Sequence, residues 1–231
     1  MATAGAAIID IGAESTRPGA RPVSVAVELA RLLPILHAVR RAVGLPISID
    51  TMKAAVARAA LAAGADMIND VTAGRFDPEL LPLCAATGVP IVLMHMRGMP
   101  RTMQVRPRYR DVVAEVVTFL QERIAAARAV GLARHQIVLD PGLGFGKLPV
   151  HSYRLLRHLE RLTALGYPVL VGPSRKRFIA SALDDAPVDQ RLFGTAAAVA
   201  LAVAGGAKLI RVHDVAAMRD VVRVTEAALA A

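Results

Sequence analysis

The stretch from Asp10 to Gly19, DIGAESTRPG, places a carboxylate, two hydroxyls and a guanidinium at four consecutive positions, 14–17. It follows a short apolar run, 6–11, that is typical of a buried strand. Pro18 stiffens the chain after these groups, and Gly19 allows the backbone to turn. Parallel α/β folds present their sites where a buried strand ends in such a polar loop. We therefore interpret this loop as part of a binding site rather than as a plain surface turn.

Carboxylate and amide groups also follow three other apolar runs. Asp140 precedes a glycine-rich segment, 142–147, while Asp50 and the pair Asn69 and Asp70 end two earlier runs. Buried carboxylates with an Asn can accept hydrogen bonds from the N–H edge of a ring such as guanine or a pterin. A helix-capping role for Asp140 and a divalent metal are the alternative uses of these oxygens. The sequence has no compact Cys/His cluster, which argues against zinc.

Basic groups accumulate near the other end of the chain. The run SRKR, 174–177, opens a helical turn, and the start of a helix with basic side chains is typical of an anion site. Arg211 and His213 add two more groups that can bind phosphate, and Arg17 adds a third. We predict that they bind a phosphorylated small molecule. Met94 and Phe145 are predicted to be walls of the pocket, whereas His95 fits core packing and function equally well.

Composition excludes several classes of protein. The formal charge is +9, but the basic residues are scattered and aromatic residues make up only 3%, so no nucleic-acid stacking surface is expected. The single cysteine, Cys84, rules out an internal disulfide and fits a reducing cytoplasm. The first five residues do not resemble a signal peptide, and the apolar run 196–204 is too short to span a bilayer. We expect a cytoplasmic protein.

Apolar strands alternate with amphipathic helices along the whole chain. The strands are predicted at 6–12, 46–50, 65–70, 89–95, 136–140, 167–172 and 207–213. The helices are predicted at 23–43, 52–63, 78–87, 109–130, 152–165 and 191–204, with a last one from 215. This pattern is typical of a parallel sheet covered by helices. With no linker or low-complexity segment, residues 1–231 are predicted to form one domain.

Every predicted strand delivers polar groups at its carboxyl end, which favours a (β/α)₈ TIM-type barrel over a doubly wound sheet. The count of strands is seven rather than eight, and an eighth strand would be needed to remove the open edges. Residues 1–5 read as the tail of a helix with its closing glycine. We therefore expect the first strand, its loop and most of the first helix to be missing.

The chain resembles dihydropteroate synthase. The matching stretches keep the family order: IIDIGAESTRPG (8–19), SIDTMK (48–53), MINDV (67–71), LMHMRGMPRTMQ (93–104), LDPGLGFGK (139–147), GPSRKRF (172–178) and IRVHD (210–214). The resemblance implies condensation of (7,8-dihydropterin-6-yl)methyl diphosphate with 4-aminobenzoate, a step of folate biosynthesis that sulfonamides target. It also implies Mg²⁺ as cofactor and a homodimer.

The family pattern assigns roles to residues of this sequence. It implies a pterin pocket formed by Asp50, Asn69, Asp140 and Lys176, with Met94 and Phe145 as its walls. The implied diphosphate contacts are Thr16, Arg17, Arg211 and His213, and the 4-aminobenzoate contacts are Arg17, Pro18, Lys176 and Arg177. Catalysis would rest on Lys176, Arg211, His213 and Arg17, through stabilisation of the leaving group and positioning.

Two departures from the family pattern matter. Ala13 replaces a glycine that is usual in the family's loop, which predicts reduced backbone freedom. The family's first strand carries an NVTPDSF-like loop whose Asn binds magnesium, and this sequence contains no such motif. The metal ligand is therefore expected outside this chain, and we expect a poor catalyst and an open, poorly stable barrel. The alternatives are a catalytically impaired or inactive pterin-binding paralogue and, on weaker grounds, the methyltetrahydrofolate-binding domain of a corrinoid methyltransferase.

Overall fold

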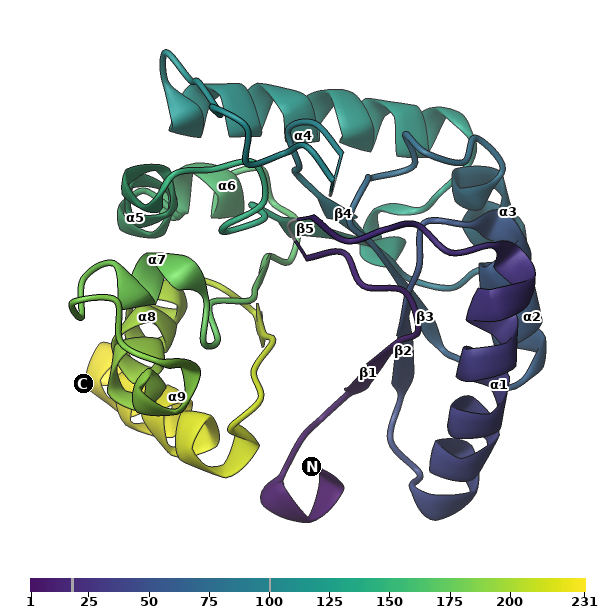
Figure 1. Ribbon diagram of the computed structural model, residues 1–231, viewed down its shortest axis with the longest axis horizontal. Helices are drawn as coiled ribbons and strands as arrows, with labels where there is room; N and C mark the ends of the chain where they lie inside the picture. The colour runs from purple at the N-terminus through teal and green to yellow at the C-terminus, as the bar shows by residue number, and fades with distance from the viewer. Residues whose placement is uncertain (18, 100) are drawn as a thin grey trace.

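The computed structural model describes residues 1–17, 19–99 and 101–231. Five parallel strands form one sheet in chain order, β1 to β5 (Figure 1). Their bounds are Ile9–Gly12, Ile47–Asp50, Met67–Asp70, Ile91–Met94 and Ile137–Asp140. A second parallel pair, β6 (Leu170–Val171) and β7 (Leu209–Ile210), continues this order, because Leu139 beside β5 forms a parallel bridge with Val169. The described residues thus contain the seven strands that the sequence predicts.

Helices surround these strands on their outer side, with α1 to α3 on one flank, α4 across the top and α5 to α9 on the other flank in Figure 1. The bounds are α1 Val25–Ala42, α2 Ala54–Ala62, α3 Leu80–Thr87, α4 Val112–Ala129, α5 Pro149–Arg157, α6 Glu160–Thr163, α7 Arg177–Ala180, α8 Leu192–Ala204 and α9 Val215–Ala230. Short 3₁₀ turns lie at Ala2–Ala4, Arg134–Gln136 and Val188–Gln190. The parallel strands with covering helices confirm the predicted α/β barrel-type fold.

One predicted helix differs from the observed structure. The segment 152–165 is predicted as a single helix but forms two, α5 and α6, because His158 leaves the helical conformation with φ −116° and ψ 35°. The first of them also begins earlier, at Pro149, where the fixed φ of proline suits the first helical position. Most strands are shorter than predicted at their amino ends, whereas β1, β2, β3 and β5 end at the predicted residues, Gly12, Asp50, Asp70 and Asp140.

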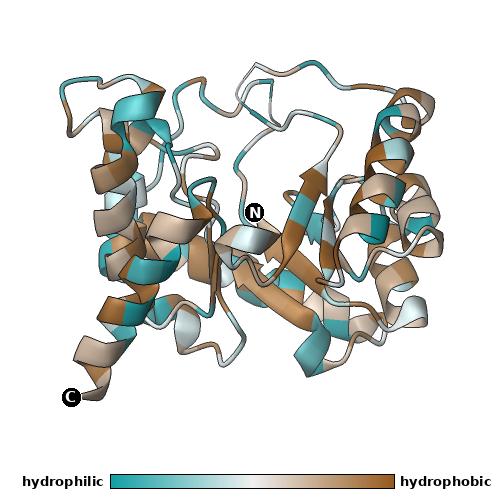
Figure 2. Ribbon diagram, turned by 90° about the horizontal axis from the view of Figure 1, so that it is seen from below, coloured by the Kyte–Doolittle hydropathy of each residue, from teal (hydrophilic) through white to brown (hydrophobic). Residues whose placement is uncertain are grey.

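Alternation along the strands separates two apolar layers. Residues such as Ile49, Ile91 and Leu139 face the helices and join the main core, whose other members come from every long helix except α9. Met67, Val92, Val138 and Leu170 form a separate cluster on the opposite face, inside the barrel. Figure 2 shows the strands as hydrophobic along most of their length, between helices that carry both kinds of residue. This period of two decides which strand residues line the interior.

Two ends of the strand order are open among the described residues. β1 pairs only with β2, and β7 pairs only with β6, so the barrel has a seam between β7 and β1. The short turn Ala2–Ala4 leads into β1 and closes with Gly5 in the left-handed region at φ +88°, as the sequence predicts for a helix tail. Within the described ranges, none of the helices has the length and apolar character needed to cross a membrane.

Candidate active site

The interior face of the strands ends in polar side chains. Asn69 and Asp140 each follow an interior residue, Met67 or Val138, by two positions, so they point the same way at the carboxyl ends of β3 and β5. Asp50 ends β2 and stands in register with Asn69. The sequence predicts these three residues as parts of one pocket, and the structure places all three at the same rim of the barrel.

Arg211 crosses the seam of the barrel and joins its two edges. Its Nε lies 2.6 Å from Oδ2 of Asp10 on β1, and its Nη2 lies 3.7 Å from Oδ2 of Asp50. The same oxygen of Asp10 accepts a hydrogen bond of 3.3 Å from Nδ2 of Asn69. Asp10 is absent from the site residues that the family pattern assigns, although its place on β1 gives it a central position. It links the predicted phosphate-binding arginine to the predicted pterin pocket.

Burial and like charge shift the protonation of Asp50. Burial, together with the nearby carboxylate of Asp10, raises the pKa of Asp50 to about 7, and Arg211 only partly offsets this. One oxygen of each carboxylate, Oδ1 of Asp10 and Oδ1 of Asp50, is buried without a hydrogen-bond partner among the described residues. Buried acceptors of this kind are costly to leave unpaired. They are suited to the N–H donors of a ligand.

The raised pKa of Asp50 predicts a pH-dependent stability. Since the folded-state pKa of about 7 lies above the ordinary value of 3.8, the folded protein binds this proton more tightly than the unfolded chain does. The resulting stabilisation is fully present below pH 3.8 and is lost as the pH rises through 7. We expect the variant Asp50→Asn, which cannot ionise, to gain more in melting temperature over the wild type at pH 8 than at pH 5. An equal difference at both pH values, measured by calorimetry, would contradict this assignment.

Lys176 and Asp140 form the other side of the rim. Nζ of Lys176 donates a hydrogen bond of 2.6 Å to the carbonyl oxygen of Leu143 and lies 4.9 Å from the centre of the Phe145 ring. Burial lowers the pKa of Lys176 to about 8, while the nearby Asp140 favours its charged form. Oδ1 of Asp140 accepts a hydrogen bond of 2.6 Å from the backbone N–H of Gly142, and burial raises the pKa of this carboxyl. The pair offers an acceptor and a donor side by side.

Methionines line the same mouth. Met94 is buried in a cluster with Met52, Val71, Met96 and Met103, and Phe145 packs against this cluster. These side chains come from the ends of β2, β3, β4 and β5 and from their loops. Met94 and Phe145 therefore meet in one apolar cluster at the carboxyl ends of the strands, and unbranched methionines suit a surface that adapts to a flat ring.

The predicted diphosphate residues lie beside the seam. Nδ1 of His213 is 2.9 Å from Oγ of Ser174, and burial lowers the pKa of His213, with further lowering by the charges of Arg175, Arg211 and Arg17. Arg17 is exposed and Thr16 is half-buried. The helix that follows Ser174 has only four residues. The positive charge at this place therefore comes from side chains and not from the dipole of a long helix.

Of the residues predicted to contact 4-aminobenzoate, the structure does not describe all. Pro18 lies outside the described residues. Arg177 is exposed at the first position of α7, while its neighbour Arg175 forms a bidentate ion pair with Asp214, at 2.5 and 3.0 Å. The structure thus brings Lys176 to the rim and leaves Arg177 on the surface beside it.

A buried ion cluster at the base of the first loop was not predicted. Nζ of Lys53 lies 2.7 Å from Oε2 of Glu14 and 2.6 Å from Oε2 of Glu28, and it also donates to the carbonyl oxygen of Val23. Glu14 accepts from the backbone N–H of Val23 at 2.9 Å, so both ends of the loop 14–23 meet at one lysine. Glu14 therefore holds the loop that carries Thr16 and does not itself face the rim. Ala13 has no positive φ and packs against the core, so its replacement of glycine causes no backbone strain.

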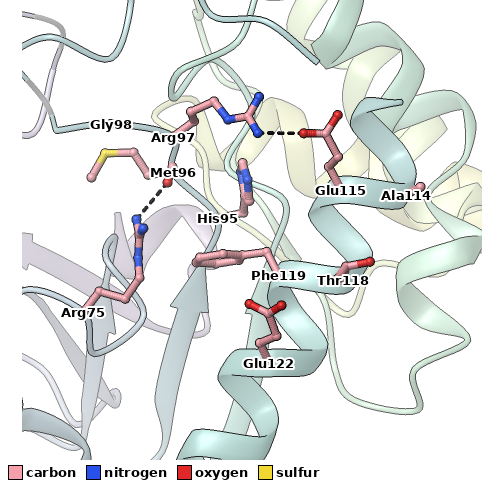
Figure 3. A pocket seen from close by; sticks show the side chains of 10 residues that line it. All are labelled: Arg75, His95, Met96, Arg97, Gly98, Ala114, Glu115, Thr118, Phe119 and Glu122. Atoms are coloured by element: carbon pink, nitrogen blue, oxygen red, sulfur yellow. Dashed lines mark hydrogen bonds and ion pairs between the residues drawn. The ribbon is translucent and has the colours of Figure 1, made fainter. Parts of the chain in front are cut away.

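A separate hollow of about 440 Å³ lies between α4 and the ends of β3 and β4 (Figure 3). Two of its cationic side chains are paired: Arg97 with Glu115 at 2.6 Å, and Arg75 with the carbonyl oxygen of Met96 at 2.8 Å. The wall includes His95, which is buried and whose pKa is lowered to about 2 by burial and by the nearby Lys147. His95 is therefore buried and neutral in this wall, and its aromatic neighbour Phe119 packs edge-on against it.

The residues described here do not form a metal site of their own. No three or more His, Cys, Asp or Glu side chains converge within ranges 1–17, 19–99 and 101–231 in a way that could hold a metal ion. The two carboxylates at the seam, Asp10 and Asp50, are engaged by Arg211. We therefore assign no chemical step to the Mg²⁺ that the family resemblance implies.

Parallel strands, covering helices and a polar rim at the carboxyl ends define an enzyme of the α/β barrel class. A family model described as pterin binding enzyme matches residues 1–213. A dihydropteroate synthase from Synechocystis is 49% identical over 227 residues, which is 98% of this chain and 78% of the relative. The chain therefore belongs to the dihydropteroate synthase family of pterin-binding enzymes, as the sequence motifs predict.

Solved structures agree with this assignment. Xanthomonas albilineans dihydropteroate synthase with 4-aminobenzoic acid has a TM-score of 0.94 at 49% identity, covering 100% of this chain and 82% of that chain. The Yersinia pestis dihydropteroate synthase with a sulfonamide drug complex has a TM-score of 0.95 at 42% identity, covering 100% and 83%. This chain spans about four fifths of the length of these relatives.

Proposed function

We propose that this protein is a dihydropteroate synthase, which condenses (7,8-dihydropterin-6-yl)methyl diphosphate with 4-aminobenzoate to give 7,8-dihydropteroate and pyrophosphate. The observation that carries the proposal is the rim itself, where buried carboxylates and an amide stand beside a lysine and an arginine. Relatives of nearly half-identical sequence carry this name, and one such structure holds 4-aminobenzoic acid. The proposal treats residues 1–231 as one pterin-binding domain.

The pterin ring presents N–H donors along one edge and acceptors along another. Asp140, Asp50 and Asn69 supply acceptors for the donor edge, and the unpaired oxygen of Asp50 favours this role. Lys176 supplies a donor for the ring's oxygen and nitrogen acceptors, and its position over Phe145 brings this donor beside an apolar wall. The flat ring would lie against Met94 and Phe145.

The diphosphate is assigned to the seam. Arg211 and His213, with Thr16 and Arg17 from the first loop, offer cationic and hydroxyl groups to its oxygens. When the bond between the methylene carbon and the diphosphate oxygen breaks, the electron pair leaves with the pyrophosphate, and these groups stabilise the added charge. The nitrogen lone pair of 4-aminobenzoate forms the new C–N bond, and the amine then loses a proton to solvent. No side-chain nucleophile is required.

The aminobenzoate carboxylate is assigned to the cationic side of the same mouth. Arg17 and Pro18 on the first loop and Lys176 and Arg177 at α7 are the proposed contacts. The buried cluster at Lys53 supports this assignment, because it fixes both ends of the loop that carries Arg17. The amine would then face the methylene carbon, and its positioning would contribute to the rate.

The proposal is tested by turnover with both substrates. We expect formation of 7,8-dihydropteroate, and we expect Arg211→Gln to lower kcat about 10²- to 10³-fold, the usual cost of removing a charge-stabilising group. Arg223→Gln, the same change on the exposed face of α9, should leave turnover unchanged. Pterin binding without turnover in the wild-type chain would instead favour the non-catalytic pterin-binding paralogue. Binding of methyltetrahydrofolate in place of the diphosphate would favour the methyltransferase domain.

Two further properties belong to this proposal. The family implies a cytoplasmic enzyme that forms a homodimer. Helices α8 and α9 leave large apolar side chains exposed, namely Phe193, Leu201, Val224 and Leu229. Such side chains support a contact between two copies of the chain. Light scattering at increasing protein concentration measures the oligomeric state, and a monomer at all concentrations would contradict a dimer.

A further inference from the structure

We propose that Lys147 is a positioning residue, whose buried amino group ties the loop after β5 to the end of β4 and thereby holds Asp140 and Lys176 in place for the pterin ring. The inference rests on the proposed function, because it gives Lys147 a part in binding that substrate. Lys147 ends the glycine-rich segment 142–147. The family pattern assigns a role to Phe145 of this segment but none to Lys147.

The surroundings of Lys147 are unusual for a lysine. The residue is 3% exposed, and its Nζ lies within hydrogen-bond distance of four acceptors. These are the carbonyl oxygens of Gly142 at 2.9 Å, Phe145 at 3.0 Å and His95 at 3.2 Å, and Nδ1 of His95 at 2.8 Å. Two acceptors belong to the loop after β5 and two belong to the residue after β4. The amino group of Lys147 therefore joins two separate loops.

These loops approach each other so closely that only glycine fits. Gly142 has φ +64°, and a Cβ on it would overlap the carbonyl oxygen of His95. Gly146 has φ +60°, and a Cβ there would overlap the carbonyl oxygen of Arg97. Carbonyl oxygens that converge in this way repel one another unless a donor lies between them. Lys147 supplies that donor.

The loop that Lys147 holds supports both central groups of the pterin pocket. The backbone N–H of Gly142 donates to Asp140, the carbonyl oxygen of Leu143 accepts from Lys176, and the ring of Phe145 lies below the Lys176 ammonium group. A shift of this segment would therefore move an acceptor and a donor of the pocket together. Binding groups that lose their supporting contacts lose their geometry.

Composition supports a specific need for lysine here. The chain has only four lysines against twenty-four arginines. Lys53 and Lys147 are buried, Lys176 is half-buried at the rim, and only Lys208 is exposed. Burial lowers the pKa of Lys147 well below its usual range, although the nearby Asp140 favours the charged form. The lysine nitrogen is a compact donor at the end of a flexible stem, which suits acceptors converging from several directions, whereas the planar guanidinium of arginine does not.

The experiment compares Lys147→Met and Lys147→Arg with the matched control Lys208→Met. Melting temperatures are measured first, and each protein is then assayed at least about 10 °C below its own transition, a margin that keeps a cooperatively folding domain native. Calorimetry gives the Kd for (7,8-dihydropterin-6-yl)methyl diphosphate, and steady-state kinetics give a separate KM for each substrate. Lys208→Met should match the wild type in all of these quantities.

We expect both Lys147 variants to bind the pterin diphosphate about tenfold or more weakly, since small displacements of binding groups have effects of this size or larger. The KM for the pterin diphosphate should rise by the same factor. The KM for 4-aminobenzoate should rise less, because Lys176 is the one proposed contact of that substrate that this loop holds. A folded variant of either kind with wild-type affinity would overturn the proposal. So would an equal loss for both substrates, or failure of both variants to fold, because either result makes Lys147 a general folding residue. If the wild-type chain fails to bind the pterin diphosphate, the proposed function itself falls, and this inference falls with it.

Discussion

The variant Asp140→Ala should lose measurable binding of (7,8-dihydropterin-6-yl)methyl diphosphate while keeping its fold. Asp140 is buried at the end of β5, where its Oδ1 accepts from Gly142 and its charge faces Lys176. Without the carboxylate, the donor edge of the ring would be buried unpaired, at a cost of about 1–3 kcal/mol for each N–H. Two such donors together cost about 2–6 kcal/mol, which corresponds to a loss of affinity of roughly 30-fold to 10⁴-fold.

Calorimetric titration measures this loss directly. Asp220→Ala is a matched control, because it removes the same group from an exposed position on α9, and it should bind as the wild type does. Asp140→Asn keeps one acceptor and the shape of the side chain, so its affinity should fall between that of the wild type and that of Asp140→Ala. Wild-type affinity of Asp140→Ala would place the pterin elsewhere, and the hollow beside His95 and Arg75 would be the next position to test.

The strand ends of the site could be predicted from the sequence because they depend on local patterns. Asp50, Asn69 and Asp140 each end a short apolar run, and parallel strands bring such ends to one rim. The resemblance then assigned their ligand. The strand count and the parallel order follow in the same way from alternation of strands and helices.

Contacts between distant residues could not be predicted in this way. Asp10 and Arg211 are 201 positions apart and meet only because β1 and β7 face each other across the seam. Glu14 looks like a site carboxylate beside Thr16, yet its partner Lys53 lies 39 positions away and draws it into the interior. The same holds for His95, whose pKa is lowered first by burial and then by Lys147, 52 positions further along. Sequence spacing carries no record of such pairs.

Lys53→Met should destabilise the folded protein by about 3–5 kcal/mol, the cost typical of removing one partner from a buried ion pair. Lys53 touches two carboxylates, of which Glu28 is fully buried and Glu14 nearly so. Glu28 also accepts a hydrogen bond of 2.7 Å from the hydroxyl of Thr51, which connects α1 to the end of β2. Methionine fills the space of the lysine stem but leaves both carboxylates without a counter-charge.

Urea unfolding of Lys53→Met beside Lys208→Met measures this loss, because the second variant makes the same change at an exposed lysine and should leave stability within about 0.5 kcal/mol. The triple variant Glu14→Gln, Glu28→Gln and Lys53→Met removes the unpaired charges and should recover a large part of the stability. A single variant as stable as the wild type would show that the cluster contributes little.

The pH dependence of Lys53→Met separates a charge effect from a packing effect. Carboxylates that are buried without a cation have raised pKa values, so the folded variant binds protons more tightly than its unfolded chain. Its stability must then fall as the pH rises, and its deficit relative to the wild type should be larger at pH 8 than at pH 5. A cavity or poor packing around the new methionine would give the same deficit at both. The cluster at Lys53 also fixes both ends of the loop 14–23, which carries Arg17. Without it the position of Arg17 is no longer fixed, so Lys53→Met should also raise the KM for 4-aminobenzoate at pH 8.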